Sequence, residues 1–570
     1  MWFMGFSKAN CQNCYACVRA CPVHAIKVKN EQAQIIKERC IVCGRCFKVC
    51  PQNAKSIKSE KEMVKHYLRG RQKVVASVAP SFAAILGEHS NKLPTALKLL
   101  GFDYVEEAIS TVHPIIEEYE KYANKPGDDT YITSFCPSVN NIIQKYYPDL
   151  AKNIIPVVSP STFNGRVLKN KYGKETRVVF IGPCLGKKND GHNEESIDLV
   201  LTFEELEKWL KEENIELKDL KEEPFSCSSK QLRLLPTIGG LTNSIEAKNP
   251  RKSIIRVDGI KDCMQVLDVV KKGQFKNTLI EMSSCRHSCI GGSGMPEDGV
   301  NCYERRENLK KYAKSCCENS DKKDEIVENE FLNIAFDKEF LSKEVLLNQP
   351  NSEQLREILN NMGKYEKSDE LNCKSCGYHT CREKGIAVYN NMAEINMCLP
   401  FMREKAEDLS NVIFDMTPNI IAIIDKELDF VQLNPSAEQF FKTSRQNIKG
   451  IPVEMFLEEE DFKKVKDTKK NIFKQRKSIK QNDATIIQSI IWLEKNQVIL
   501  WIADDITKNE ELQEKLQKMK IDAIDMAQKV INKQMTVAQE IASLLGETTA
   551  ETKVTLTQLK NLILEDEVSM

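Results

Sequence analysis

The chain has 570 residues, and at about 150 residues per domain it has room for roughly three to five domains. Hydrophobic residues make up 41% and charged residues 29%, a balance typical of globular proteins. Lys plus Arg and Asp plus Glu both number 82, and this zero net charge argues against nucleic acid or a membrane surface as a partner. No apolar run approaches roughly 18 residues, and residues 1–6 lack a signal-peptide pattern, so we expect a cytoplasmic protein.

Two groups of cysteines near the N-terminus share one spacing, C-x2-C-x2-C-x3-C-P. The groups are Cys11, Cys14, Cys17, Cys21 and Cys40, Cys43, Cys46, Cys50. Cytosolic thiols stay reduced, so metal binding is a better explanation than disulfides. The spacing is typical of bacterial ferredoxins, and two copies predict two 4Fe-4S clusters in which the fourth cysteine of each run ligates the other cluster. Cys50 therefore joins the first three cysteines and Cys21 joins the second three. Zinc fits poorly, because zinc sites use two ligand pairs.

A second type of group lies further along the chain, within residues 366–402. It comprises Cys373, Cys376, Cys381 and Cys398. Four thiolates fit a third 4Fe-4S site, but zinc also accepts four cysteines and stays open as an alternative. Four cysteines complete either site, so His379 is expected to be a solvent-exposed side chain and not a ligand.

Four cysteines stand far apart in sequence, each near Gly, Pro or Ser. They are Cys136, Cys184, Cys285 and Cys289. Dispersed cysteines on loops can converge on one cluster, although a buried free cysteine is also a common core residue. The remaining ones are interpreted as structural, namely Cys227, Cys263, Cys302, Cys316 and Cys317.

The segments around these four cysteines, residues 132–137, 182–188 and 281–292, resemble the three signature loops of the FeFe-hydrogenases, T-S-C-C-P, M-P-C-x-x-K and E-x-M-x-C-x-x-x-C. The resemblance implies an H-cluster, a 4Fe-4S cubane joined to a two-iron unit with CO, CN and azadithiolate ligands. By position the four cysteines would hold the cubane, and Cys289 would bridge to the two-iron unit. Lys187 would donate to one cyanide, and the stretch Ala79, Pro80 and Ser81 would bind the other.

Departures from the family loops are expected to slow the chemistry. Phe135 replaces the cysteine that shuttles protons in the family, and a benzyl ring neither donates nor accepts a proton. Ser283 and Gly182 replace family methionines. By a gapped count Glu118 resembles a proton-relay glutamate of the family, and Glu281, Ser283 and Ser284 are local alternatives. For each of them, an ordinary hydrogen-bonded core role is the simpler interpretation.

Residues 403–508 contain neither histidine nor cysteine. Strands are predicted at 419–425 and 430–434 and as a hairpin at 486–493 and 498–503, with short helices between. Asn434, Glu438 and Asp505-Ile-Thr507 resemble the signatures of PAS domains. Without His or Cys, a histidine-ligated haem or a cysteinyl flavin adduct is excluded, and an empty PAS domain is favoured over one with a noncovalent ligand.

Residues 509–570 are predicted to be helical, with an apolar heptad seam that favours a homodimer over a helix packed on its own domain. The seam is Leu512, Leu516, Met519, Ala523, Met526 and Val530. No histidine in this segment can accept a phosphoryl group and no ATP-binding motif follows, so the output kinase or phosphatase is expected to be a separate protein.

We therefore expect a multidomain α/β and α+β chain with five parts. They are a ferredoxin domain at 1–60, an α/β H-cluster domain at 61–365, a 4Fe-4S module at 366–402, a PAS domain at 403–508 and signalling helices at 509–570. The resemblance implies a sensory FeFe-hydrogenase with three accessory clusters, acting slowly on H2 and protons with a ferredoxin-type redox partner. The alternatives are a metabolic, bidirectional hydrogenase and a non-catalytic hydrogenase-like iron-sulfur protein.

Overall fold

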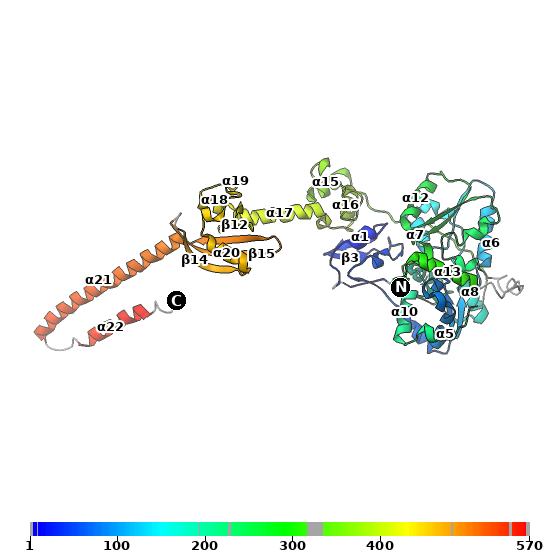
Figure 1. The fold of residues 1–570 in the computed structure, drawn as a ribbon, viewed down its shortest axis with the longest axis horizontal. Coiled ribbons are helices and arrows are strands. Elements are labelled where there is room, and N and C mark those ends of the chain that lie inside the picture. Colours follow the sequence, from blue (N-terminus) through cyan, green and yellow to red (C-terminus); the bar gives the residue numbers. More distant parts are fainter. Residues whose placement is uncertain are drawn as a thin grey trace. The chain divides into compact units, whose positions relative to one another are not determined.

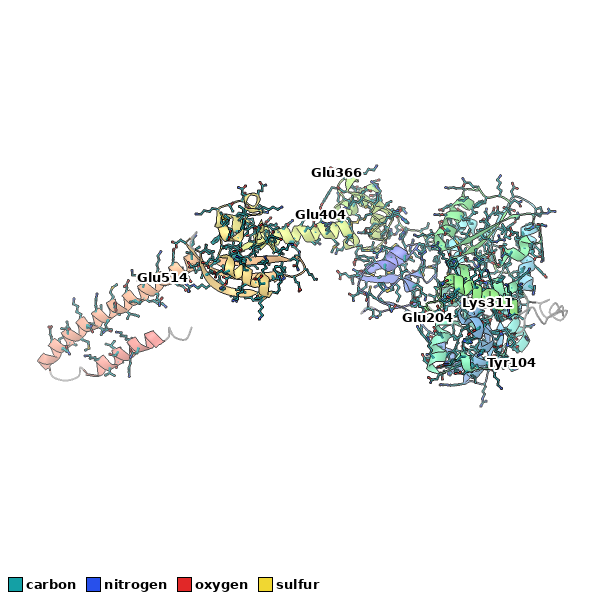
Figure 2. All side chains as sticks on the ribbon, in the orientation of Figure 1. Tyr104, Glu204, Lys311, Glu366, Glu404 and Glu514 are labelled. Atoms are coloured by element: carbon teal, nitrogen blue, oxygen red, sulfur yellow. The ribbon has the colours of Figure 1, made fainter. Side chains whose placement is uncertain are left out.

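The computed structural model describes residues 4–7, 10–192, 194–225, 230–315, 334–479, 483–545 and 550–565. The chain divides into two compact units, Met1–Met402 and Arg403–Met570 (Figure 1). Side chains fill the space between the sheets and helices of each unit (Figure 2). Of the cysteines interpreted as structural, Cys227, Cys316 and Cys317 lie outside the described residues. Among those described, no helix has the length and apolar character needed to cross a membrane.

The N-terminal cysteine runs lie in a small domain of two antiparallel hairpin-like sheets. Its strands pair β1 with β4 and β2 with β3, over β1 Met4–Phe6, β2 Ile26–Lys29, β3 Gln32–Ile35 and β4 Lys55–Ile57. One short helix begins after the second cysteine of each run and contains the third, α1 Ala16–Ala20 and α2 Arg45–Lys48. Each begins after a residue with positive φ, Tyr15 and Gly44, so the chain turns sharply between cysteines.

Two parallel sheets form the larger part of the first unit. The four-stranded sheet has the order β6-β5-β8-β9, with β5 Val74–Val78, β6 Tyr104–Glu107, β8 Arg177–Gly182 and β9 Leu199–Thr202. The three-stranded sheet has the order β10-β11-β7, with β7 Thr130–Ile132, β10 Ser253–Asp258 and β11 Thr278–Ser283. Strands β5, β9 and β11 are buried along their whole length, as expected of parallel strands covered on both faces.

Helices cover both parallel sheets (Figure 1). Those of the four-stranded sheet include α3 Lys61–Leu68, α4 Phe82–Leu86, α5 Leu93–Leu99, α8 Pro160–Tyr172, α9 Leu185–His192, α10 Phe203–Glu212 and α13 Cys302–Ser315. Those of the three-stranded sheet are α6 His113–Asn124, α7 Pro137–Tyr146, α11 Thr242–Glu246 and α12 Ile260–Lys271. Proline in the first turn of α6, α7 and α8 fixes where these helices begin, because that position has no intrahelical N–H bond to lose.

The Cys373 group lies in a small helical module. It consists of α15 Ser352–Asn361 and α16 Cys381–Tyr389 with the loops beside them. Helix α17, Leu399–Met416, begins directly after Cys398 and crosses the boundary between the two units in the chain.

The second unit contains a five-stranded antiparallel sheet with the order β13-β12-β16-β15-β14. Its strands are β12 Ile420–Ile424, β13 Phe430–Leu433, β14 Ile472–Ile479, β15 Ala484–Leu493 and β16 Val498–Asp505. Its short helices are α18 Pro435–Phe441, α19 Arg445–Ile448 and α20 Glu459–Thr468. The predicted strands and the β15–β16 hairpin are confirmed, and β14 was not predicted.

The C-terminal segment is helical as predicted, with α21 Thr507–Leu545 and α22 Ala550–Glu565. The apolar residues of the predicted seam are exposed on α21. Leu512, Met519 and Met526 are 59%, 59% and 66% exposed, which is unusual for large apolar side chains in a row along one helix.

Candidate metal centre

The three cysteine loops of the larger domain follow the carboxyl ends of parallel strands. Phe135 and Cys136 come after β7, Cys184 comes after β8, and Cys285 and Cys289 come after β11. The loops that follow the carboxyl ends of strands β5 and β6 lie beside these cysteine loops. Ligand sites in parallel α/β sheets lie at the carboxyl ends of the strands, because loops from several strands meet there.

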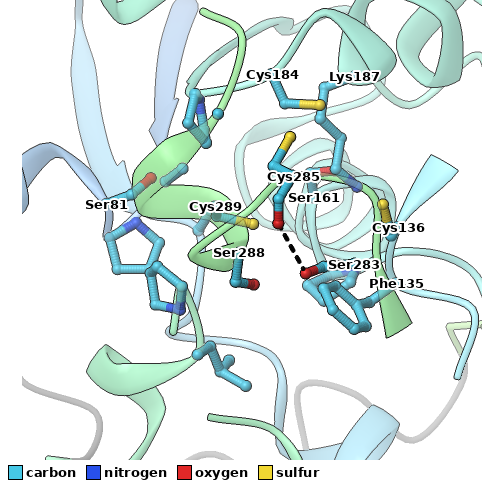
Figure 3. A pocket seen from close by; sticks show the side chains of 18 of the residues that line it. Ser81, Phe135, Cys136, Ser161, Cys184, Lys187, Ser283, Cys285, Ser288 and Cys289 are labelled. Atoms are coloured by element: carbon cyan, nitrogen blue, oxygen red, sulfur yellow. Dashed lines mark hydrogen bonds between the residues drawn. The ribbon is translucent and has the colours of Figure 1, made fainter. Parts of the chain in front are cut away.

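These loops enclose one cavity with an empty volume of about 920 Å³ (Figure 3). It brings together ten of the residues predicted for this site, namely Ala79, Pro80, Ser81, Phe135, Cys136, Cys184, Lys187, Ser283, Cys285 and Cys289. Most of the other lining residues are apolar, including Ala108, Ile109, Pro160, Phe180, Leu235, Pro236 and Leu241. The cavity wall is therefore mostly apolar, with a few polar groups in it.

Burial raises the pKa of three of the four thiols, those of Cys184, Cys285 and Cys289. The pKa of Cys184 rises to about 11 and that of Cys289 to about 12, and the pKa of Cys285 lies well above its usual value. Nearby thiols raise these values too, whereas Lys187 lowers the pKa of Cys184 and Cys289. Without iron these groups are neutral at pH 7. Iron binding would displace their protons, so affinity for a cluster would rise with pH.

The ammonium group of Lys187 is held in place by Asp190, a buried acid on the same helix. Its Nζ lies 3.4 Å from Asp190 Oδ2. Asp190 also accepts a 2.6 Å hydrogen bond from Ser159 and pairs with Lys338 at 3.2 Å. Burial alone would raise the pKa of Asp190, but Lys187 and Lys338 lower it to about 2. The carboxylate is therefore charged at neutral pH and holds the ammonium at the cavity wall.

The loop replacements are accommodated by specific neighbours. A Cβ on Gly182 would lie 2.5 Å from the Phe180 ring, so glycine here leaves room for that ring, which lines the cavity. Ser283 Oγ donates to Cys285 O at 3.5 Å. Ser284 Oγ lies 3.7 Å from Cys136 Sγ and 3.8 Å from Cys285 Sγ. These serines are tied to the cysteine loops, and Phe135 brings no polar atom to the cavity.

Two hydroxyl groups in the cavity wall make no hydrogen bond of normal geometry among the described residues. Ser81 Oγ and Ser288 Oγ are buried and have no hydrogen-bond partner among the residues that the structure describes. Leaving a buried hydroxyl unpaired costs about 1–3 kcal/mol, so such groups are expected to meet a bound partner. Together with four thiols and one ammonium, they fit a cluster that carries small anionic ligands.

Two residues considered as proton relays are engaged in other hydrogen bonds. Glu118 does not line the cavity, and its Oε2 accepts a 2.8 Å hydrogen bond from Lys121 at the surface. The structure gives Glu118 no contact with the cavity, and the relay role from the gapped count stays a prediction. Glu281 is buried and accepts hydrogen bonds from Gly239 N and from the backbone and side chain of Thr242. It anchors the loop that carries Leu241 into the cavity wall, which is the ordinary core role.

The N-terminal cysteines gather in two sets. Cys21 lines one small cavity with Cys40, Cys43 and Cys46. Burial raises the pKa of Cys17, and the neighbouring thiols of Cys11, Cys50 and Cys14 raise it further. In both sets the fourth member comes from the other run. Backbone N–H groups also donate to three sulfurs, from Ala25 to Cys21, Val42 to Cys40 and Ala54 to Cys50, at 3.2 to 3.4 Å.

The later cysteine group lines a further cavity of its own, formed with Lys364, Lys384 and Tyr378. Its members are Cys373, Cys376, Cys381 and Cys398. His379 is exposed, as expected of a non-ligand. Lys384 is buried and donates to Ile395 O at 2.9 Å, so it adds positive charge beside the four thiols.

Comparison with known proteins identifies the cysteine-rich parts. Residues 72–293 match the C-terminal domain of the iron-only hydrogenase large subunit, residues 10–62 match a 4Fe-4S dicluster domain, and residues 369–400 match an Fe-S cluster family. The chain is an FeFe-hydrogenase-like iron-sulfur protein. The hydrogenase match implies an H-cluster, and the match over residues 369–400 favours iron-sulfur over zinc for the Cys373 group.

Several curated hydrogenases resemble this FeFe-hydrogenase-like protein at low identity. The NADP-reducing hydrogenase subunit HndD of Solidesulfovibrio fructosivorans is 25% identical over 51% of this chain and 57% of its own length. The periplasmic Fe hydrogenase large subunit of Nitratidesulfovibrio vulgaris is 28% identical over 52% of this chain and 86% of its own. Iron hydrogenase 1 of Clostridium pasteurianum is 25% identical over 46% of this chain and 56% of its own.

Other similarities are more distant. A cytosolic Fe-S cluster assembly factor of Danio rerio, narfl, is 22% identical over 39% of this chain and 71% of its own. A solved FeFe-hydrogenase of Chlamydomonas reinhardtii covers 50% of this chain and 100% of its own at 15% identity, with a TM-score of 0.38. A PAS domain from Haloarcula marismortui covers 18% of this chain and 95% of its own at 14% identity, with a TM-score of 0.16.

Several residues of the cavity were not found from sequence. Phe180, Pro236 and Leu241 come from apolar runs that look like ordinary core. Ser288 stands between two predicted ligands, and its position in the third loop was the available signal.

Proposed function

We propose that the protein is a hydrogen-sensing FeFe-hydrogenase that interconverts H2 and protons slowly. One observation carries this proposal. A single cavity holds four thiols, one ammonium and two unpartnered hydroxyls, yet Phe135 occupies the position where the family carries its proton-shuttling cysteine. The cavity is equipped to hold the cofactor and is poorly equipped to supply protons quickly.

The ligand assignment follows the grouping of the cysteines. Cys136, Cys184, Cys285 and Cys289 would hold the cubane of the H-cluster, with Cys289 bridging to the two-iron unit. The three accessory 4Fe-4S clusters would take three sets of four: Cys11, Cys14, Cys17, Cys50; Cys21, Cys40, Cys43, Cys46; and Cys373, Cys376, Cys381, Cys398. Each set surrounds a common space, or comprises thiols close enough to alter one another's pKa.

The protein side of the chemistry is positioning and exclusion of water. When bound, the H-cluster supplies heterolytic cleavage and formation of H2. Lys187, held by Asp190, would donate to one anionic ligand, and Ser81 would donate to another from the far wall. Fixed donors in an apolar cavity act strongly because the local dielectric is low. The ring of Phe135 has no exchangeable proton, so it cannot pass protons to the cofactor.

Packing supports an order for the electron path. Cys43 and Cys285 line the same groove, and a Cβ on Gly44 would lie 2.5 Å from Ser293, so the Cys21 set lies next to the H-cluster cavity. At the other end, a Cβ on Gly377 would lie 2.9 Å from Val18 in α1. The Cys373 module therefore packs on the ferredoxin domain. Electrons would pass between the H-cluster and the Cys373 cluster through the two ferredoxin clusters.

The second unit would be the signalling part, with residues 403–508 as a PAS domain. The PAS signature residues hold its fold together. Asn434 caps α18 and bonds the backbone of Ile421 and Asn419, and Thr507 bonds Asp505 and the backbone of Thr485. The exposed seam of α21 would pair with a second copy of the chain. Helix α17 links the ligand Cys398 to this unit in the chain, and a separate kinase or phosphatase would read its state.

The test combines infrared spectra with turnover on one sample. The protein is reconstituted with iron and sulfide, loaded with the two-iron complex, and recorded before and after exposure to H2. We expect CO and CN bands that shift under H2, together with slow turnover. Electron paramagnetic resonance of the reduced protein without the two-iron complex should count the cubanes.

The other outcomes separate the alternatives. Bands with fast turnover would make the protein a metabolic, bidirectional hydrogenase. A protein that binds its cubanes but shows no CO or CN bands would be a non-catalytic iron-sulfur protein, a possibility raised by its similarity to the Danio rerio assembly factor. The unpartnered Ser81 and Ser288 hydroxyls count against that outcome, because cubanes alone leave them unpaired.

A further inference from the structure

The turn between Cys285 and Cys289 has an unusual backbone. His287 and Ser288 have φ of 64° and 58°, so two consecutive residues with side chains occupy the left-handed region. Glycine takes this conformation without penalty, whereas other residues pay for it. Strained backbone that persists next to a binding site indicates that the side chain placed there is needed.

The two side chains of this turn have different surroundings. The His287 ring packs edge-on to Tyr303 at 5.5 Å and stands outside the cavity. The Ser288 side chain lines the cavity and is 1% exposed. Its hydroxyl points into the cavity beside Cys289 (Figure 3) but makes no hydrogen bond of normal geometry to any residue in the described part of the chain.

The neighbouring hydroxyls of this loop are already engaged. Ser283 donates to Cys285 O, and Ser284 lies between the sulfurs of Cys136 and Cys285. Phe135, across the cavity, offers no polar atom. Ser288 is therefore the one hydroxyl of the third loop that, within the described residues, makes no hydrogen bond of normal geometry, although it lies close enough to the Cys289 thiol to lower its pKa.

We propose that Ser288 is a hydrogen-bond donor to the group bound next to Cys289, placed there at the expense of backbone strain. Its partner would be a basic or anionic atom of the ligands carried by the two-iron unit. The inference rests on the proposed function, because the two-iron unit would supply the acceptor. It adds a donor on the Cys289 side of the cavity, opposite Phe135.

The test compares three variants of the full-length protein. Ser288→Ala removes the hydroxyl and keeps the strain, Ser288→Gly removes both, and His287→Gly relieves the adjacent strain outside the cavity. Each is loaded with the two-iron complex, and its infrared bands are recorded. We expect CO or CN bands to shift beyond the linewidth in both Ser288 variants and to keep the wild-type positions in His287→Gly.

A second readout uses the same proteins with cubanes only. If the hydroxyl serves the bound group, neither glycine variant should lower the Tm of the unloaded protein, because glycine is the unstrained residue at both positions. The inference is overturned if the bands of Ser288→Ala coincide with wild type, or if both Ser288 variants lower the Tm of the unloaded protein. Absence of bands in the wild type would instead refute the proposed function, and this inference with it.

Discussion

The core of residues 403–508 contains aromatic side chains that pack against one another, whereas the cavity at the ends of the two parallel sheets is lined by four thiols and by two hydroxyls that make no hydrogen bond of normal geometry within the described residues. In the former, Phe430, Phe441, Phe456 and Trp501 pack against one another with ring centroids 5.2 to 6.1 Å apart. The Trp501 indole donates to Gln488 Oε1 at 2.9 Å, so its one polar group is satisfied. In the latter, the two hydroxyls are those of Ser81 and Ser288, and burial raises the pKa of three of the four thiols.

The aromatic core of the second unit is filled by its own side chains, whereas the cavity of the first unit would be filled by a cofactor. Aromatic rings stabilise the sheet of the second unit by burial alone. The unpaired hydroxyls in the cavity of the first unit lower the stability of the protein without cofactor, since burying an unpaired hydroxyl costs free energy. Substitutions in the aromatic core should therefore lower stability, whereas substitutions in the cavity should impair cofactor binding.

The largest effect is expected from Cys289→Ala in the cavity. This change removes a thiolate that would hold the cubane and bridge to the two-iron unit, so CO and CN bands and turnover should be lost after loading. Infrared spectroscopy of the loaded variant checks this expectation. A partial effect with normal band positions would contradict the ligand assignment.

The matched control is Cys263→Ala, which removes another buried thiol of the same domain. Cys263 Sγ donates to Ser283 O at 3.3 Å but does not line the cavity. Loading and band positions should survive, at a cost of about 1–2 kcal/mol in the free energy of unfolding. Loss of the bands here as well would indicate that the domain is sensitive to any core change.

In the second unit, Trp501→Ala should destabilise the sheet by about 3–5 kcal/mol, because it opens a large cavity and leaves Gln488 without its indole partner. Hydrogen exchange of the amides in β12 to β16 measures this loss. The cluster spectra should stay unchanged. Phe473→Ala, at a side chain that is 64% exposed, should change stability by less than about 0.5 kcal/mol.

The absence of an acid at position 135 gives the next prediction. Phe135→Cys would place a proton donor beside Cys136, and general acid catalysis typically contributes about 10²-fold or more. Turnover of the loaded variant should therefore rise by about 10²-fold. Phe135→Leu removes the ring without adding an acid and should not raise turnover. An equal gain in both variants would mean that the ring blocks access to the cavity, while no gain in either would refute Phe135 as the brake.

The cysteine frame could be predicted from sequence, because cluster ligands have fixed spacing and short loops between them. The strands β12, β13, β15 and β16 were also predictable from their apolar runs. Strand β14, Ile472–Ile479, was not, because it carries four Lys, Arg or Gln residues in eight and its outward face is exposed. The helix around Glu118 could not be oriented from the sequence, since an offset of one residue along a helix places a different side chain inward.

The rest of the site depends on contacts between distant loops. Tyr119, next to Glu118, is fully buried and bonds Ser134 at 2.9 Å, one residue before Phe135. The unpartnered state of Ser288 and the fit of Phe180 over Gly182 follow from three-dimensional packing, and no sequence period encodes either. Apolar residues that line a cavity and apolar residues that fill a core look alike in sequence.

The smallest effect is expected from Asp190→Asn, which tests whether the charges of the cavity wall contribute stability before any cofactor binds. Burial opposes the charged form, yet Lys187 and Lys338 lower the pKa of Asp190 from 3.8 to about 2. The unfolded chain therefore binds the proton more tightly, and this carboxylate contributes about 2 kcal/mol above pH 4 that is lost as the pH falls from about 4 to 2. Asn should lower the free energy of unfolding by that amount at pH 7 and weaken its acid dependence, as measured by denaturant titrations at several pH values. Asp149→Asn, at an exposed acid 4.0 Å from Lys271, should do neither. If Asp190→Asn leaves stability at pH 7 unchanged, the cost of burying these charges cancels their attraction, and the cavity wall is organised by the cofactor alone.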